Sequence, residues 1–178
     1  MIRRVKDEDA KELVEIYNYY IKNTNITLEL RELTEKEYLE RIHQVTAFYP
    51  WLVYEEEGKI IGFAYLDKFN SRKAYLTTAD LSIYVSYDSI RKGIGLELYK
   101  EIEKLGLSLG ICKIISIITK ENNRSILFHN RLGFKEICNI DHVAFKFGKW
   151  VSVTFMEKNI QTLIMDNLNK DEPTYRKK

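Results

Sequence analysis

The stretch DLSIYVSYDSIRKGIGLELYKEIEKLGLSLG, residues 80–110, decides the fold that this chain is expected to adopt. Its first seven residues alternate between polar and apolar side chains, which is typical of a strand with one buried face. Gly93 and Gly95 then mark a turn, and apolar residues recur at helical spacing until Gly110. The stretch therefore predicts a strand, a glycine-rich turn and a helix in direct succession.

The turn within this stretch has the chemistry of a phosphate site. Backbone N–H groups converge at the start of a helix and carry positive potential there, and glycine lets the backbone approach a ligand closely. Arg91 and Lys92 add positive charge beside the turn. A lone Gly-x-Gly pair is also common in ordinary turns, and this one matches neither a P-loop nor the dinucleotide-binding fingerprint. The turn by itself leaves phosphate binding and an ordinary turn open.

The composition excludes several classes of protein. The chain has 178 residues, 45% hydrophobic and 30% charged, which is typical of one soluble domain with a full core. The net charge is +2 and the basic residues are scattered, which argues against nucleic acid as a partner. No apolar run approaches the length of a membrane span, and the first residues lead straight into charged ones. We therefore expect a cytoplasmic protein without a membrane partner.

The cysteines and histidines predict no metal site. Cys112 and Cys138 lie in apolar, strand-like runs, so we expect reduced and buried thiols. The three histidines are far apart in the sequence, and no Cys/His cluster has the spacing of metal ligands.

The remaining patterns predict a mixed α/β domain over residues 1–160, followed by a polar tail at 161–178. Asp7 is the expected cap of the first helix, and Thr34 with Glu37 forms a capping box that starts the second. Expected helices cover 8–22, 34 to the region before Pro50, 93–110 and 122–133. Expected strands cover 2–6, 51–55, 60–69, 74–86, 111–119, 134–140, 143–147 and 150–157. The strand–helix–strand unit of 80–119 implies one parallel strand pair inside the sheet.

Several local strings occur in an order that one enzyme family shares. They are Tyr49-Pro50-Trp51-Leu52-Val53, Gly62-Phe63-Ala64-Tyr65, Arg72-Lys73-Ala74-Tyr75, Ile83-Tyr84-Val85-Ser86, Gly93-Ile94-Gly95-Leu96-Glu97-Leu98-Tyr99, the run from Asn122 to Phe134, and Phe145-Lys146-Phe147-Gly148-Lys149-Trp150. Over about residues 1–158 the chain resembles the GNAT superfamily of acetyl-CoA-dependent N-acetyltransferases. Within that superfamily it resembles the phosphinothricin acetyltransferase group.

The resemblance implies a central twisted sheet, mixed but mostly antiparallel, with flanking helices and two splayed parallel strands. The pantetheine arm of acetyl-CoA would lie between the strand that ends at Val85 and the strand that starts at Ile111. The resemblance assigns the arm to the backbone of Ile83, Tyr84 and Val85, and its far end to Asn122. It assigns the pyrophosphate to Arg91, Lys92, Gly93, Ile94, Gly95 and Leu96.

Acetyl transfer from a thioester to an amine needs a neutral amine, a stabilised oxyanion and a leaving thiolate that is protonated or tolerated. We assign the base to Asp80, because a carboxylate inside an apolar strand is costly unless it is paired or functional. Partial burial would raise its pKa, which suits a base. A structural carboxylate paired with a basic neighbour is the alternative interpretation.

The other two needs have candidates nearby. A backbone N–H near Tyr84 or Val85 is the expected donor to the oxyanion. His129 is the candidate for the leaving thiolate, because imidazole titrates near physiological pH, although a lone histidine beside an apolar face is often structural. Tyr99 is expected either to line the same pocket or to pack in the core.

The expected substrate is a small primary amine, most simply an amino acid analogue. Arg72 and Tyr75 would bind it, since a carboxylate or phosphinate needs a fork of donors and arginine supplies one. A solvated hairpin arginine is the alternative. Phosphinothricin, methionine sulfoximine, methionine sulfone and other small amines all remain compatible.

Three positions depart from the family pattern. Ile90 stands where Gln or Arg usually opens the pyrophosphate motif, and Ser152 replaces a common acidic residue. Asp80 replaces the usual Glu and is one methylene shorter, so proton abstraction could run through a water molecule. Acetylation of a peptide or protein amine, and a non-catalytic acyl-CoA-binding module, are the alternative functions. The resemblance also implies a homodimer, with Trp150 and the closing strands as its interface.

Overall fold

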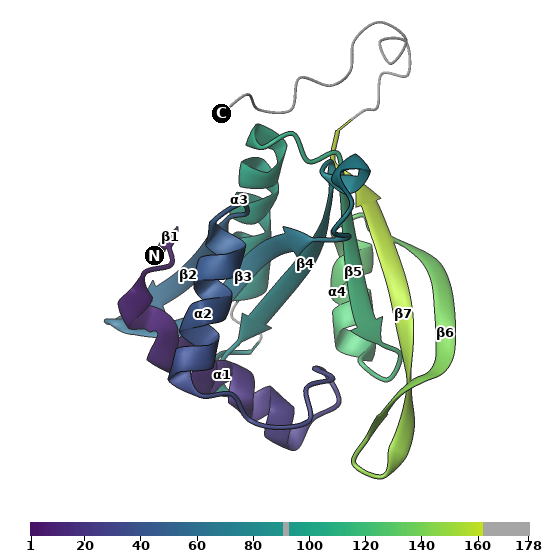
Figure 1. Ribbon diagram of the computed structural model, residues 1–178, viewed down its shortest axis with the longest axis horizontal. Coiled ribbons are helices and arrows are strands. Elements are labelled where there is room, and N and C mark those ends of the chain that lie inside the picture. The colour runs from purple at the N-terminus through teal and green to yellow at the C-terminus, as the bar shows by residue number, and fades with distance from the viewer. Residues whose placement is uncertain (91–92, 162–178) are drawn as a thin grey trace, which may run out of the picture.

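The computed structural model describes residues 1–90 and 93–161. It contains a mixed sheet of seven strands in the order β1-β2-β3-β4-β5-β7-β6 (Figure 1). The strands are β1 (Ile2–Arg4), β2 (Trp51–Glu56), β3 (Lys59–Lys68), β4 (Thr78–Val85), β5 (Lys113–Thr119), β6 (Lys135–Lys146) and β7 (Lys149–Asn159). The helices are α1 (Ala10–Asn23), α2 (Glu35–Thr46), α3 (Ile94–Ser108) and α4 (Asn123–Arg131). The mixed, mostly antiparallel sheet with flanking helices is the fold that the sequence predicts.

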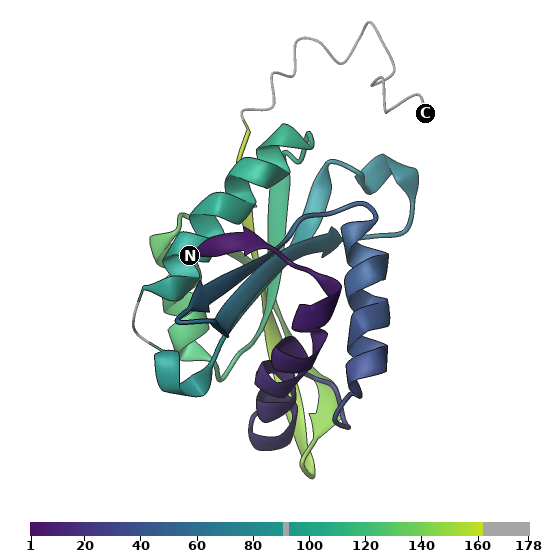
Figure 2. The same ribbon diagram turned by 90° about the vertical axis from the view of Figure 1, so that its left-hand side faces the viewer.

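Helices cover both faces of the sheet, and each face has its own apolar core (Figure 2). α1 and α2 pack on one face over a core rich in aromatic rings, including Tyr17, Tyr38, Trp51 and Phe63. α3 and α4 pack on the other face over mostly aliphatic side chains from β3, β4 and β5. The sheet is therefore packed between two helical layers, one on each face.

The parallel pair β4–β5 separates after three residues. β4 pairs with β5 only at Thr78, Ala79 and Asp80, and Asp80 lies opposite Ile115. Beyond that point β4 stays paired with β3 and β5 stays paired with β7. The two strands consequently form a V that opens toward their C-terminal ends, as Figure 1 shows.

The helix starts differ in part from the sequence expectation. Asp7 does not cap α1, because residues Asp7–Asp9 form a 3₁₀ turn ahead of the helix. The Asp9 carboxylate instead accepts the Lys6 N–H at 2.8 Å and binds the Arg3 guanidinium at 2.7 Å. The capping box of α2 is confirmed, with Thr34 and Glu37 exchanging hydrogen bonds of 2.8 and 3.2 Å.

Two strand predictions are wrong in detail. The strand expected at 74–86 begins only at Thr78, because Lys73–Tyr75 form a 3₁₀ turn. The two strands expected at 134–140 and 143–147 are one strand, β6, whose pairing with β7 shifts register twice. Bulges of this kind keep an irregular strand paired across a break in alternation.

Both cysteines are free, but neither is buried as expected. Cys112 is partly exposed in the bend before β5, and Cys138 is exposed on β6. β6 is the edge strand of the sheet, so an apolar run there does not imply burial. Within residues 1–90 and 93–161, no group of three or more His, Cys, Asp or Glu side chains could hold a metal ion. In the same part of the chain, no helix is long and apolar enough to cross a membrane.

Candidate active site

A pocket of about 720 Å³ occupies the V between β4 and β5. Its walls contain the predicted residues of β4, namely Ile83, Tyr84 and Val85, together with His129 of α4 and Asn122, which precedes α4 as its cap. They also contain the predicted residues of the turn and α3: Gly93, Ile94, Gly95 and Leu96. Arg91 and Lys92 lie outside the described residues. The structure thus brings most of the predicted cofactor residues to one cavity.

The backbone of β4 is arranged for a ligand in this pocket. The Thr77 carbonyl accepts N–H groups of the chain entering β5, whereas the Ser86 N–H donates to Ile61 of β3 at 2.8 Å. Because successive residues of a strand direct their backbone groups to opposite neighbours, Ile83 and Val85 face the gap. The Val85 carbonyl accepts the Tyr20 hydroxyl at 2.5 Å.

Tyr84 has a different place from the one expected. By the same alternation its backbone faces β3, so it is not available to a ligand in the V. Its ring packs 5.0 Å from Tyr17 and 5.4 Å from Phe63, in the core under α1. Tyr84 therefore forms the wall of the pocket, and the arm would pair with Ile83 and Val85.

The start of α3 has the form of an anion site. Gly93 precedes the helix with φ +81°, a left-handed conformation that glycine adopts without strain. A Cβ built on Gly93 would meet no atom of the described residues within 4 Å, so the space on their side of it is open. A Cβ on Gly95 would meet Phe128 at 3.5 Å and Ile83 at 3.9 Å. The Leu96 N–H donates to the Gly93 carbonyl at 2.9 Å, whereas the Ile94 and Gly95 N–H groups ahead of it have no partner among the described residues and can bind phosphate oxygens.

α4 presents His129 to the pocket in a defined tautomer. The His129 Nδ1 lies 2.8 Å from the Ser125 carbonyl oxygen, which can only accept, so Nδ1 carries the hydrogen. Nε2 is left with a lone pair. Burial lowers the pKa of His129 below its usual value, against a smaller raising effect of the Ser125 hydrogen bond. Asn122 caps α4 through its Oδ1, which accepts the Ser125 N–H at 3.2 Å, and keeps its amide N–H₂ for a ligand.

Asp80 lies at the vertex of the V. Its Oδ1 is buried and has no hydrogen-bond partner among the described residues. Burial first, and then the negative charge of Asp67 directly opposite on β3, raise the pKa of Asp80 to about 7, although the Leu81 backbone N–H opposes this. No described cation pairs with Asp80, which argues against a salt-bridged structural carboxylate. Asp80 is outside the pocket lining, but its neighbours Leu81 and Ser82 are part of it.

The other predicted residues lie outside the pocket lining. Tyr99 is buried in the core, where its hydroxyl donates to Glu103 and accepts from Lys158, both at 2.9 Å. This favours the packing interpretation of Tyr99. Arg72 and Tyr75 are exposed on the connection between β3 and β4, which leads into Asp80.

Sequence reasoning missed several residues of the pocket wall. They include Tyr20 of α1, and Ser116, which sits inside a nearly continuous apolar run. Arg124 and Arg131 of α4 also line the pocket and place cationic groups beside it. The signal for Ser116 was present, since a single polar residue in a buried apolar strand calls for a reason.

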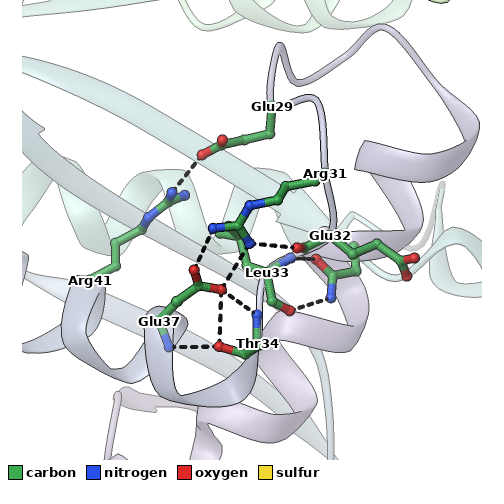
Figure 3. Close-up of polar contacts among 8 residues, drawn as sticks. Glu29, Arg31, Glu32, Leu33, Thr34, Glu37 and Arg41 are labelled. Carbon is green, nitrogen blue, oxygen red and sulfur yellow. Dashed lines mark hydrogen bonds and ion pairs between the residues drawn. The ribbon is translucent and has the colours of Figure 1, made fainter.

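The connection between α1 and α2 forms one rim of the pocket through Ile26. Figure 3 shows how ion pairs hold this connection, with Arg41 bound to Glu29 at 2.6 Å and Arg31 bound to Glu37 at 2.5 Å. These bonds fix the rim against α2.

The chain matches the model of the acetyltransferase (GNAT) domain over residues 2–155. It is 28% identical to phosphinothricin N-acetyltransferase of Streptomyces viridochromogenes, over 90% of this chain and 87% of that protein. It is 29% identical to L-methionine sulfoximine/L-methionine sulfone acetyltransferase of Salmonella typhimurium, over 88% and 92%. A GNAT superfamily phosphinothricin acetyltransferase from Sinorhizobium meliloti, solved in complex with AcCoA, superposes with a TM-score of 0.86 at 32% identity, covering 89% of this chain and 87% of that one.

The residues of the pocket fit acetyl-CoA. The free N–H groups of Ile94 and Gly95 suit a pyrophosphate, and the Ile83 backbone and the Val85 N–H, which face the gap, suit the amides of the pantetheine arm. With this geometry and the family match over most of its length, the chain belongs to the GNAT acetyltransferase family and is an acetyl-CoA-dependent N-acetyltransferase.

Proposed function

We propose that a single domain over residues 1–160 acetylates the primary amine of a small amino acid analogue, by direct attack within a ternary complex. The observation that carries the proposal is the buried Asp80 Oδ1 at the vertex of the V, which has no hydrogen-bond partner among the described residues and belongs to a carboxyl with a raised pKa. Phosphinothricin and methionine sulfoximine, the substrates in the names of the relatives, are the compounds to test first.

Acetyl-CoA supplies an activated acetyl thioester, and the protein manages the protons and charges around it. A pKa of about 7 lets Asp80 accept a proton near neutral pH, directly or through one water molecule. The Ile83 N–H faces the gap on the vertex side of Val85 and is the proposed donor to the negative charge that develops on the acetyl oxygen, whereas the Val85 N–H is left for the pantetheine arm. His129 contributes the Nε2 lone pair as a hydrogen-bond acceptor, since burial disfavours the imidazolium form that could donate to a thiolate.

We propose Arg72 and Tyr75 as the residues that bind the acceptor. Their connection enters β4 at Thr78, two residues before Asp80. An arginine fork would bind the carboxylate or phosphinate and leave the amine near the base. Arg72→Gln should raise the KM of an amino acid substrate roughly 10-fold or more while leaving the KM of acetyl-CoA unchanged. Equal KM values for the amine in both proteins would remove Arg72 from the site.

A homodimer through the outer surface of β6 and β7 is part of the proposal. Apolar side chains are exposed there, with Trp150 60% exposed and 5.3 Å from the ring of Phe145, which is itself exposed. Val143 and Phe147 extend the same exposed set. Light scattering after size exclusion should give twice the chain mass, and Trp150→Lys should give the monomer. A monomeric wild-type protein would contradict the dimer. Two free thiols fit the reducing cytoplasm that we propose as the location.

The test of the function is a thiol-release assay with acetyl-CoA and a panel of amines. The panel contains phosphinothricin, methionine sulfoximine, methionine sulfone, a polyamine and a short peptide. Turnover confined to the amino acid analogues would support the proposal. Turnover of the peptide alone would favour a protein-amine acetyltransferase, and binding of acetyl-CoA without any turnover would favour a binding module.

A further inference from the structure

Ser116 carries a buried hydroxyl whose purpose the fold does not explain. It lies on β5 directly after Ile115, the last residue of β5 that pairs with β4. Its exposed fraction is 1%, and its Oγ has no hydrogen-bond partner among the described residues. Ser116 also lines the pocket in the V. A buried hydroxyl without a partner is unfavourable, so a partner from outside the chain is the simplest explanation.

The surroundings of Ser116 are apolar. Ile114 and Ile118 precede and follow it by two positions, on the same face of β5, and both belong to the core under α3 and α4. Met156 lies opposite on β7 and is fully buried in that core. The hydroxyl is thus an isolated polar group at the narrow end of the pocket. In apolar surroundings of this kind a hydrogen bond is electrostatically stronger than in water.

If acetyl-CoA binds in the V as the proposed function requires, its thioester end lies beside Ser116. Gly93 of the phosphate site lines the same pocket as Val85, which ends β4 on the open side of the V. The base Asp80 is at the vertex, so the acetyl thioester must extend to the vertex for its carbonyl to meet the amine. Ser116 stands next to that point on the opposite strand.

The leaving sulfur needs a donor that His129 does not provide. The single ring hydrogen of neutral His129 is on Nδ1, which donates to the Ser125 carbonyl. Nε2 can only accept. The Ser116 O–H is free to rotate and has no other acceptor among the described residues.

We propose that the Ser116 hydroxyl donates a hydrogen bond to the sulfur of CoA and stabilises the thiolate as it leaves. In this step the C–S bond breaks and its electron pair stays on sulfur. The C–N bond forms, and the amine proton goes to Asp80. The hydroxyl proton remains on Ser116 throughout, and only its hydrogen bond strengthens as charge develops on sulfur.

The variants Ser116→Thr and Ser116→Val form a matched pair, because their side chains have nearly the same shape and only Thr keeps a hydroxyl. The primary readout is the ionisation of bound CoA, followed by the ultraviolet absorbance of its thiolate across a pH series. We expect the thiol pKa of bound CoA to be lower by about one unit in the wild type and Ser116→Thr than in Ser116→Val. The kcat of amine acetylation should follow the same order: Ser116→Thr should keep the wild-type kcat, and Ser116→Val should have a kcat reduced roughly 10-fold.

Calorimetry with CoA and with desulfo-CoA, which lacks the thiol, separates the sulfur contact from general packing. At a pH where bound CoA is a thiolate, Ser116→Val should bind CoA about 10-fold more weakly than Ser116→Thr and bind desulfo-CoA equally well. Ser116→Ala removes an unpartnered hydroxyl, so its thermal stability without ligand should equal or exceed that of the wild type.

This inference would be overturned, and the proposed function left standing, if the thiol of bound CoA had the same pKa in the wild type and in all three Ser116 variants while the wild type still acetylated an amine. A wild-type protein that binds neither CoA nor acetyl-CoA would overturn the proposed function, and the role of Ser116 with it.

Discussion

Replacing Asp80 by Asn should lower activity and raise stability at the same time. The raised pKa means that the folded protein holds this proton to higher pH than the unfolded chain does. Wild-type stability therefore falls as pH rises between the unfolded pKa of 3.8 and the folded pKa of about 7. The difference of about 3 pKa units corresponds to about 4 kcal/mol, at 1.36 kcal/mol per unit. Asp80→Asn has no such titration, so its stability should not decline over this range.

The assay is chemical denaturation of both proteins at pH 4.5 and at pH 8. The free energy of unfolding of the variant, relative to the wild type, should increase by a few kcal/mol between the two conditions. Turnover at saturating acetyl-CoA should fall about 100-fold or more, because a positioned base contributes that much. The reasoning would be refuted by a variant that is less stable than the wild type by the same amount at both pH values, or by one that retains full turnover.

Other changes test the surroundings of the vertex. Asp67→Asn removes the negative charge opposite Asp80, so the pKa of Asp80 should fall and the acidic limb of the pH–rate profile should move to lower pH; an unmoved limb would contradict the coupling between these two strands. The pKa of His129, measured by NMR titration of its ring, should lie below 6.5, and a value above it would contradict the neutral tautomer used here. Gly62→Ala places a Cβ 3.1 Å from Ile94 Cγ2 and 3.2 Å from the Tyr84 carbonyl oxygen, so we expect about 1–3 kcal/mol of destabilisation in a denaturant titration. Gly58→Ala is the control variant: it lies on an open turn with φ +76°, so it tests backbone strain without steric crowding.

The sequence predicted the sheet and the strand–turn–helix unit because those features depend on local pattern, whereas the V and the cofactor residues in part of its lining were implied by the family resemblance. The alternation in β4, the glycine turn and the helical spacing of α3 can each be recognised from consecutive residues. The order of these elements then matched that of one enzyme family. The bounds of β4 were harder, since the 3₁₀ turn at Lys73–Tyr75 uses residues that also suit a strand. The exposure of Cys138 depends on β6 being an edge strand, which only the complete strand order reveals.

The chemistry of the site needed the three-dimensional arrangement. A sequence cannot show that Asp67 on β3 lies directly opposite Asp80 on the neighbouring strand β4. It also cannot show that the Nδ1 hydrogen of His129 is donated to the Ser125 carbonyl. The same holds for Tyr99, whose helical spacing suits both a pocket and a core until its bonds to Glu103 and Lys158 are seen. Ser116 was visible as a polar residue in an apolar run, but its missing partner is a property of the fold.

The claim at the centre of this account is that the Asp80 carboxyl is the proton acceptor in amine acetylation. Its most direct test is the titration of the Asp80 carboxyl carbon by NMR, on the same protein whose pH–rate profile is measured. The account predicts that the carboxyl titrates near pH 7 and that the acidic limb of the rate profile coincides with it. A carboxyl that titrates near its usual 3.8, or a rate limb far from the measured pKa, would contradict the claim.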